Sequence, residues 1–199
     1  MPRPTIQRVC VFCGSRPGNG SQYLDAARRL GSLMAERGIG LVYGGASVGL
    51  MGAVASAVLS GGGEAIGVIP EALVQRELAH DHLTDLRVVG SMHERKALMA
   101  ELSDATIALP GGFGTFEELF EMVTWSQLGL HRKSIGMLNV GGFYDGLIAL
   151  MEHAIAEGFI PEQHRELLLS ASDPDTLLDL ILTHDPPTPY FKWLDRNQT

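Results

Sequence analysis

The sequence predicts an α/β fold, in which a mostly parallel, doubly wound sheet carries helices on both faces. Short apolar runs that suit buried strands alternate with segments whose apolar residues recur at helical spacing. The connections between these runs are short, and several of the runs end in glycine-rich turns. Strands that alternate with helices form βαβ units, so the predicted architecture is Rossmann-like.

Six apolar runs are expected to form the strands of this sheet. They cover residues 8–12, 41–43, 65–69, 87–89, 105–109 and 135–138. In open parallel sheets, ligands bind outside the carboxyl ends of the strands, where the strand order reverses. We therefore expect the functional residues in the loops that follow these runs.

The segments between the strands carry helical patterns. In the first of them, Leu24, Ala27, Leu30 and Met34 share one face, and Ser21 is the expected N-cap. Helices are expected over residues 21–37, 52–60, 93–102, 117–123, 143–157 and 174–182, with one short helix carrying Glu77 in the connector of residues 70–82.

Length and charge limit the possible functions. A chain of 199 residues suits one domain, and we expect a single nucleotide-binding unit over residues 1–199, folded from about residue 8 to residue 184, with a proline- and aromatic-rich tail at 185–199. The formal charge of −8 argues against a nucleic-acid binder held by bulk electrostatics. No apolar run is long enough to cross a bilayer, and the first residues lack signal-peptide architecture, so a cytoplasmic location is expected.

The cysteines and histidines do not suggest a metal site. Cys10 and Cys13 stand three residues apart on the first strand, so their side chains should point to opposite faces. We expect both to be buried, structural thiols. His80 and His82 have the closest histidine spacing but lack companion ligands, so no metal is predicted.

The stretch of residues 110–118, PGGFGTFEE, lies where the fifth strand turns into a helix. Its glycines, Gly111, Gly112 and Gly114, would let the backbone approach a ligand closely, and unpaired amides at the helix start favour an anion such as phosphate. Glu117 and Glu118 have a structural alternative, because carboxylates in a first helical turn also complement the helix dipole.

Arg95 and Lys96 follow the fourth strand, at the same expected edge as the glycine-rich turn. An isolated pair of this kind is most often solvated surface. Beside a phosphate-binding turn, the arginine could hold phosphate or ribose oxygens at two points, and the lysine would add a point charge.

The glycine loops do not suit redox or kinase chemistry. The turn after the first strand reads CGSRPG, which is not the dinucleotide fingerprint, and Gly44 and Gly45 stand where an acidic residue would hold a ribose diol. A kinase-type phosphate loop is also absent from the sequence. We expect a mononucleotide or sugar-phosphate ligand and no cofactor.

Glu118 is the candidate for chemistry. Breaking the bond between ribose C1′ and a base nitrogen passes through an oxocarbenium-like state. A carboxylate near C1′ either stabilises that positive charge or deprotonates the attacking water. Glu117 would then accept hydrogen bonds from ribose hydroxyls. Glu77 alone is an ordinary surface carboxylate, and Thr124 alone a helix-surface or back-bonded threonine.

The combination of SMHERK, LPGGFGTFEEL and VTWSQLGLHRKSIGMLN, with YGGASVGLMG and CGS upstream, resembles the LOG ("Lonely Guy") family over roughly residues 9–159. Members are cytokinin riboside 5′-monophosphate phosphoribohydrolases, which release free base and ribose 5-phosphate. The resemblance implies N6-substituted adenine nucleotides, and often AMP, as substrates, no cofactor and a homodimer. The family is also labelled lysine decarboxylase, but no lysine here stands in a pyridoxal-phosphate context.

The resemblance also implies roles for residues of this chain. It places the catalytic pair on Arg95 and Glu118. The implied substrate-binding residues are Ser15, Gly44, Gly45, Glu77, Met92, Arg95, Lys96, Gly111, Gly112, Phe113, Gly114, Thr115, Phe116, Glu117, Glu118 and Thr124.

Two positions depart from the family pattern. Ala46 replaces a usual third glycine, and Ser91 stands where an aspartate commonly precedes Met-His, which could alter the base end of the site. A non-catalytic nucleotide carrier or sensor of the same fold is the alternative, because fold alone does not establish catalysis.

Overall fold

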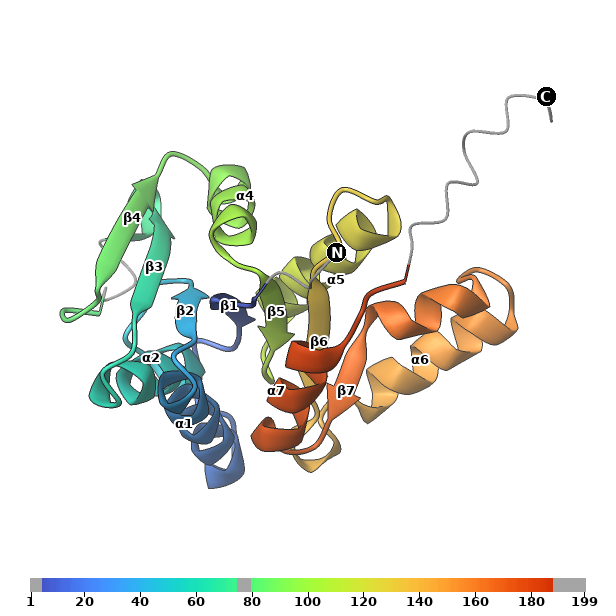
Figure 1. Cartoon of the computed structure of the whole chain (residues 1–199), viewed down its shortest axis with the longest axis horizontal. Helices are drawn as coiled ribbons and strands as arrows, with labels where there is room; N and C mark the ends of the chain where they lie inside the picture. Colours follow the sequence, from blue (N-terminus) through green and yellow to red (C-terminus); the bar gives the residue numbers. More distant parts are fainter. Residues whose placement is uncertain (1–4, 75–79, 188–199) are drawn as a thin grey trace.

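A computed structural model describes residues 5–74 and 80–187. Their strands form one seven-stranded sheet in the order β4-β3-β2-β1-β5-β6-β7, and all neighbouring strands run parallel (Figure 1). The strands are β1 Arg8–Phe12, β2 Gly40–Tyr43, β3 Ala65–Pro70, β4 Asp85–Val89, β5 Ala105–Ala108, β6 Ser134–Leu138 and β7 Leu169–Ala171.

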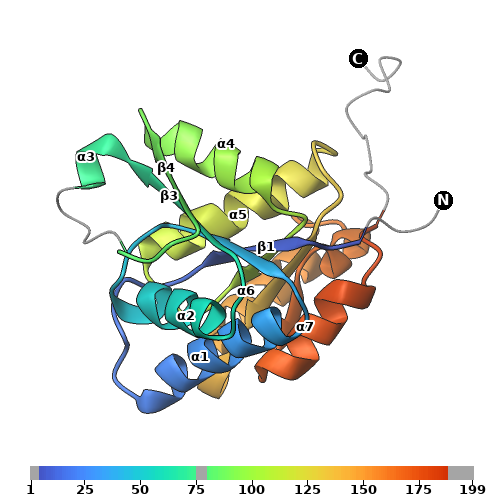
Figure 2. The same cartoon turned by 60° about the vertical axis from the view of Figure 1, so that its left-hand side comes forward.

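Helices cover both faces of this sheet (Figures 1 and 2). One hydrophobic cluster joins the sheet to α1, α2 and α7, and the other joins it to α4, α5 and α6. The helices are α1 Ser21–Glu36, α2 Gly49–Ser60, α3 Glu71–Val74, α4 Met92–Leu102, α5 Phe113–Gln127, α6 Asp145–Ala156 and α7 Pro174–Thr183, with 3₁₀ turns η1 Val140–Gly142 and η2 Glu162–Leu167. The predicted fold class, doubly wound and Rossmann-like, is confirmed.

The central strands are continuous apolar runs because both of their faces are covered. Every residue of β2, β3, β5 and β6 is buried, whereas β4, at one edge of the sheet, has no fully buried residue. Cys10 and Cys13 are both buried and unpaired, and they belong to the two different clusters, as the alternation of side chains along β1 predicts.

The strand order reverses between β1 and β5. From β1 the chain adds β2, β3 and β4 on one side, and β5, β6 and β7 extend the other side. Phe12 lies opposite Ala108 at the carboxyl ends of this central pair, and the Gly14 amide donates to the Pro110 carbonyl over 3.1 Å. The loops after β1 and β5 therefore meet where a doubly wound fold places its ligand.

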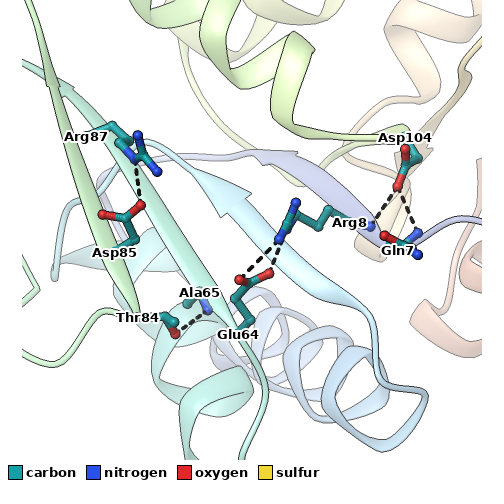
Figure 3. A network of polar contacts seen from close by, with 8 residues as sticks. All are labelled: Gln7, Arg8, Glu64, Ala65, Thr84, Asp85, Arg87 and Asp104. Atoms are coloured by element: carbon teal, nitrogen blue, oxygen red, sulfur yellow. Dashed lines mark hydrogen bonds and ion pairs between the residues drawn. The ribbon is translucent and has the colours of Figure 1, made fainter.

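Polar contacts join the strands at the opposite edge (Figure 3). Arg8, which begins β1, pairs with Glu64 before β3 over 2.6 Å, and Asp104 before β5 accepts the Arg8 amide over 3.0 Å. The Thr84 hydroxyl accepts the Ala65 amide over 3.0 Å. Since the Arg8 and Glu64 side chains are more than a third exposed, their ion pair fixes strand register more than it adds stability.

Some local predictions were wrong. The N-cap of α1 is Gly20, and Ser21 is the first helical residue. Helix α5 begins at Phe113, so its first turn contains no acidic residue and Glu117 and Glu118 lie in its second turn. The sequence analysis did not predict β7 or the 3₁₀ turn η2 before it. The short helix in the connector is α3, and Glu77 lies outside the described residues.

Within the two described ranges, no helix combines the length and apolar character needed to span a membrane.

Candidate functional site

Two adjoining cavities open at the carboxyl edge of β1 and β5. They have volumes of about 480 and 320 Å³ and share Gly14, Ser15 and Gly112 as a common wall. The larger cavity lies between the β1 and β5 loops, with Arg16, Asn19, Tyr23, Leu50 and Phe143 among its lining residues. The smaller one contains Arg95 and Glu118, so we place the chemistry there although its volume is smaller.

The start of α5 forms one side of the smaller cavity. The Phe116 amide makes a helical hydrogen bond to the Gly112 carbonyl, and the amides ahead of it have no partner within the helix. Beside Gly112 and Gly114, no heavy atom lies within 4 Å of the position that a Cβ would occupy. An anion could therefore approach this helix end, where the helix dipole is positive.

Gly111 and Thr115 hold this turn in place. A Cβ on Gly111 would lie 2.1 Å from the Thr115 Oγ1 and 2.9 Å from the Gly14 nitrogen. Thr115 is buried and lines the smaller cavity. The structure therefore gives Gly111 a packing role between the two loops, whereas Gly112 and Gly114 lie open to a ligand.

Glu118 extends from the second turn of α5 into the smaller cavity. No residue of the described chain forms a hydrogen bond or ion pair with its carboxyl group. Burial raises the pKa of Glu118 to about 7, against the lowering effect of Arg95, and the neighbouring Glu117 raises it further. The dipole alternative fails, since Glu118 lies beyond the first turn, and a poised, unpaired carboxyl in a cavity is typical of a functional site.

Arg95 lies in the first turn of α4 and is 6% exposed, so it is not a solvated surface residue. Its Nε donates to the Val68 carbonyl over 3.0 Å and its Nη2 donates to the Gly44 carbonyl over 3.1 Å. A Cβ on Gly44 would lie 2.2 Å from that Nη2. The backbone carbonyls of Val68 within β3 and of Gly44 just after β2 thus fix the guanidinium, which keeps further N–H groups for a ligand.

Lys96 takes a different position from the one that the sequence suggested. Its side chain is 9% exposed and its ammonium forms ion pairs with Glu117 and, over 3.0 Å, with Glu121. Lys96, Glu117 and Glu121 line neither cavity. The structure therefore joins Lys96 to α5, and of these two basic residues only Arg95 lines the smaller cavity.

The remaining predicted residues lie around this centre. Ser15 and Gly44 line the smaller cavity, and Met92 and Phe113 form its exposed rim, Phe113 being 91% exposed. Gly45, by contrast, packs against Gly67 and Leu86.

Two further predicted residues lie outside both cavities. Phe116 packs on the rings of Phe143 and Tyr144. The Thr124 hydroxyl donates to the Phe120 carbonyl over 2.7 Å, as the back-bonded interpretation predicts.

Several cavity residues were not singled out by the sequence analysis. Met51 and Met99 line the smaller cavity, and Tyr23, Leu50 and Phe143 line the larger one. The only signal for Met51 and Leu50 was the glycine-rich turn that contains them. Tyr23 and Phe143 have no motif, because only the fold brings α1 and the start of α6 together. In the part of the chain that the structure describes, no group of three or more His, Cys, Asp or Glu side chains could hold a metal.

Comparisons with known proteins identify the family of this chain. A family model described as "Possible lysine decarboxylase" matches residues 51–181. A probable cytokinin riboside 5′-monophosphate phosphoribohydrolase of Oryza sativa subsp. japonica is 52% identical over 181 residues, covering 91% of this chain and 80% of the relative. A cytokinin riboside 5′-monophosphate phosphoribohydrolase of Arabidopsis thaliana is 49% identical over 91% of this chain and 85% of its own length.

Among solved structures, a molybdenum cofactor binding protein from Rippkaea orientalis superposes with a TM-score of 0.67 and 24% sequence identity, covering 87% of this chain and 94% of that one. At that identity the likeness shows a shared fold alone. The curated relatives are about twice as similar in sequence, and each match covers 91% of this chain. The chain belongs to the LOG family of cytokinin riboside 5′-monophosphate phosphoribohydrolases.

Proposed function

We propose that this protein hydrolyses the N-glycosidic bond of cytokinin riboside 5′-monophosphates, releasing the free base and ribose 5-phosphate. The observation that carries the proposal is Glu118, a largely buried carboxyl with a pKa of about 7 and with no hydrogen-bond or ion-pair partner among the residues that the structure describes. A nucleotide carrier has no need for such a group, whereas a hydrolase working near neutral pH does.

The mechanism begins with the position of the phosphate. The 5′-phosphate binds the free amides at the start of α5, beside Gly112 and Gly114. Ribose then lies along the second turn of the helix, with C1′ near Glu118. Arg95 donates its remaining N–H groups to ribose or phosphate oxygens from a fixed position.

Bond cleavage leaves positive charge on the ribose ring and an electron pair on the departing base nitrogen. The Glu118 carboxylate stabilises that positive charge and takes a proton from the attacking water. The water oxygen bonds to C1′, the C1′–N bond breaks, and the base gains a proton. Each step uses side chains of this chain and water, so the proposal needs no cofactor.

Lysine-dependent decarboxylation has little support from this site. A lysine that forms Schiff bases works with a lowered pKa. Burial opposes the charge of Lys96, but the hydrogen bonds of Glu117 and Glu121 outweigh that effect and raise its pKa. The ammonium of Lys96 is therefore held in its protonated form.

We extend the proposal to AMP and to a cytoplasmic location. AMP differs from cytokinin riboside monophosphates only at N6 of the base, and the residues argued above act on the phosphate and the sugar. Cys10 and Cys13 are free thiols, which suits a reducing compartment.

The test is release of base from AMP and from isopentenyladenosine monophosphate, followed by chromatography. We expect turnover of at least one of them, and we expect Glu118→Ala and Arg95→Ala each to lower kcat/KM by at least about a hundredfold. Glu166→Ala and Arg28→Ala are matched controls, because both residues are exposed and lie outside the two cavities. A folded wild-type protein that releases no base would remove the proposal.

The same samples separate the enzyme from the carrier or sensor. Calorimetry that finds tight AMP binding, together with no base release, supports a carrier. Unchanged turnover in the Glu118 and Arg95 variants would mean that a different site is catalytic.

A further inference from the structure

Lys96 in α4 pairs with two carboxylates of α5, Glu117 and Glu121, but not with Glu118. Lys96 follows Arg95 in α4, and Glu117, Glu118 and Glu121 lie in the first half of α5. The Lys96 ammonium contacts Glu117 and lies 3.0 Å from Glu121, and neither carboxylate lines the cavity that holds Glu118. The helix α5 thus carries three carboxyl groups near this lysine, and two of them form ion pairs with it.

The helical spacing explains this division. Glu117 and Glu121 are four residues apart, so their side chains lie on one side of α5 and can share one cation. Glu118 is turned away from that side, toward the cavity. Glu117 is more than half exposed, whereas the side chain of Glu121 is 24% exposed and is the more firmly placed of the two.

We propose that Glu121 is a positioning residue of this site, which together with Glu117 holds the Lys96 ammonium and so keeps it from pairing with Glu118. The inference rests on the proposed function of Glu118 and names a residue that the motif does not contain. Its role is indirect, because Glu121 lines neither cavity and acts through Lys96.

Among the described residues, the charged and titratable groups around Glu118 come from α4, from α5 and from β1 with the residue that follows it. Arg95 and Lys96 face it from α4, Glu117 and Glu121 from α5 itself, and the buried thiols Cys10 and Cys13 from β1. Both cations lower the pKa of Glu118, and both carboxylates raise it. The thiols stay neutral, since burial raises the pKa of each.

Removing the Glu121 charge has two effects of the same sign. The negative charge that disfavours ionisation of Glu118 is lost, and Lys96 loses one of the two anchors that hold it away from Glu118. Both effects lower the pKa of Glu118. A unit charge at this helical spacing is expected to shift it by about half a pH unit or more.

The experiment compares the pH dependence of kcat/KM for AMP or isopentenyladenosine monophosphate in the wild type, Glu121→Gln, Glu121→Asp and Glu101→Gln. We expect the acid limb of Glu121→Gln to move to lower pH by about half a unit or more, and that of Glu121→Asp to stay near the wild type, because aspartate keeps the charge. Glu101→Gln removes the same charge from an exposed position at the end of α4, and its limb should not move.

A second readout does not depend on turnover. Carbon-13 NMR of the glutamate carboxyl groups, with the Glu118 signal assigned by its loss in Glu118→Gln, follows the same titration directly. A downward shift in Glu121→Gln supports the inference even if the wild type releases no base, in which case the proposed function alone fails. An unchanged titration in a folded Glu121→Gln, or an equal shift in Glu121→Asp, overturns it.

Discussion

Burial of Glu118 lowers the stability of the folded protein at neutral pH. Its pKa is raised from the ordinary 4.5 to about 7, chiefly by burial, so the folded chain binds a proton more tightly than the unfolded chain does. Below pH 4.5 the Glu118 carboxyl is protonated in both the folded and the unfolded chain, so it lowers the free energy of unfolding only slightly. Between pH 4.5 and about 7 the unfolded chain loses this proton while the folded chain keeps it, so the free energy of unfolding falls as the pH rises, and the loss is complete above the folded pKa.

We therefore predict that Glu118→Gln stabilises the protein in a pH-dependent way. The gain in unfolding free energy over the wild type should be near zero at pH 4.5 and on the order of 2 kcal/mol at pH 8, because glutamine has no charge to bury. Urea unfolding at both pH values measures it, with Glu166→Gln as an exposed control. An equal gain at both pH values would contradict a raised pKa.

Sequence reasoning was strongest for residues that follow a strand directly. Arg95 and Glu118 could be placed at one edge of the sheet because parallel strands bring their carboxyl ends together. The ion pairs of Lys96 could not be predicted, since they depend on how α4 crosses α5. For the same reason the sequence analysis did not single out Glu121.

At the scale of elements, the start of α4 positions Arg95. Ser91 is the N-cap of this helix, and its hydroxyl accepts the Glu94 amide over 3.1 Å. Glu94 in turn accepts the Gly90 amide over 2.7 Å, which completes a reciprocal capping arrangement. The sequence departure at Ser91 thus has a structural role, because serine and the family's common aspartate are both good caps.

This arrangement leads to a prediction for Ser91. Ser91→Ala should lower the free energy of unfolding by about 1 kcal/mol, and Ser91→Asp should leave it close to the wild-type value. Because the hydroxyl is engaged by the helix, Ser91→Asp should also keep the wild-type preference between AMP and isopentenyladenosine monophosphate. Thermal unfolding measures the change in stability, and kcat/KM for the two substrates measures the preference. A changed preference in Ser91→Asp would mean that residue 91 does affect the base end of the site.

The bounds of elements were predictable where burial is continuous. Strands β1, β3 and β6 were placed to within one residue because both of their faces are covered by helices. Strand β7 was missed, since it has only three residues, of which Leu169 and Ala171 are partly buried and Ser170 is exposed. The predicted start of α5 was several residues too late. Glycine has a low helix propensity, so Gly112 and Gly114 did not suggest a helix, although packing against the sheet stabilises one from Phe113.

At the scale of the molecule, the two faces of the sheet differ in what they leave exposed. On the side of α4, α5 and α6, large apolar side chains remain open in and after α5 and α6. They are Phe120, Leu128, Leu130, Leu150 and Phe159, with Leu130 70% and Phe159 85% exposed. On the side of α1, α2 and α7, Leu180 is exposed on α7 at 37%. Exposed apolar groups of this size favour an interface with another chain.

We predict a homodimer formed through the α5 side of the sheet. Sedimentation equilibrium should give twice the chain mass of 21.4 kDa at micromolar concentration. Phe120→Glu and Leu130→Glu should each shift the protein toward the monomer, because a buried interface does not accommodate an unpaired carboxylate. Leu180→Glu, on the opposite face, should leave the mass unchanged.

Since Phe120 follows Glu117 and Glu118 on α5, a dimer on this side would lie close to the catalytic helix. Turnover measured in the same variants therefore tests whether assembly and activity are linked. A wild-type protein that sediments as a monomer and still turns over substrate would contradict the predicted dimer and show that activity does not depend on assembly.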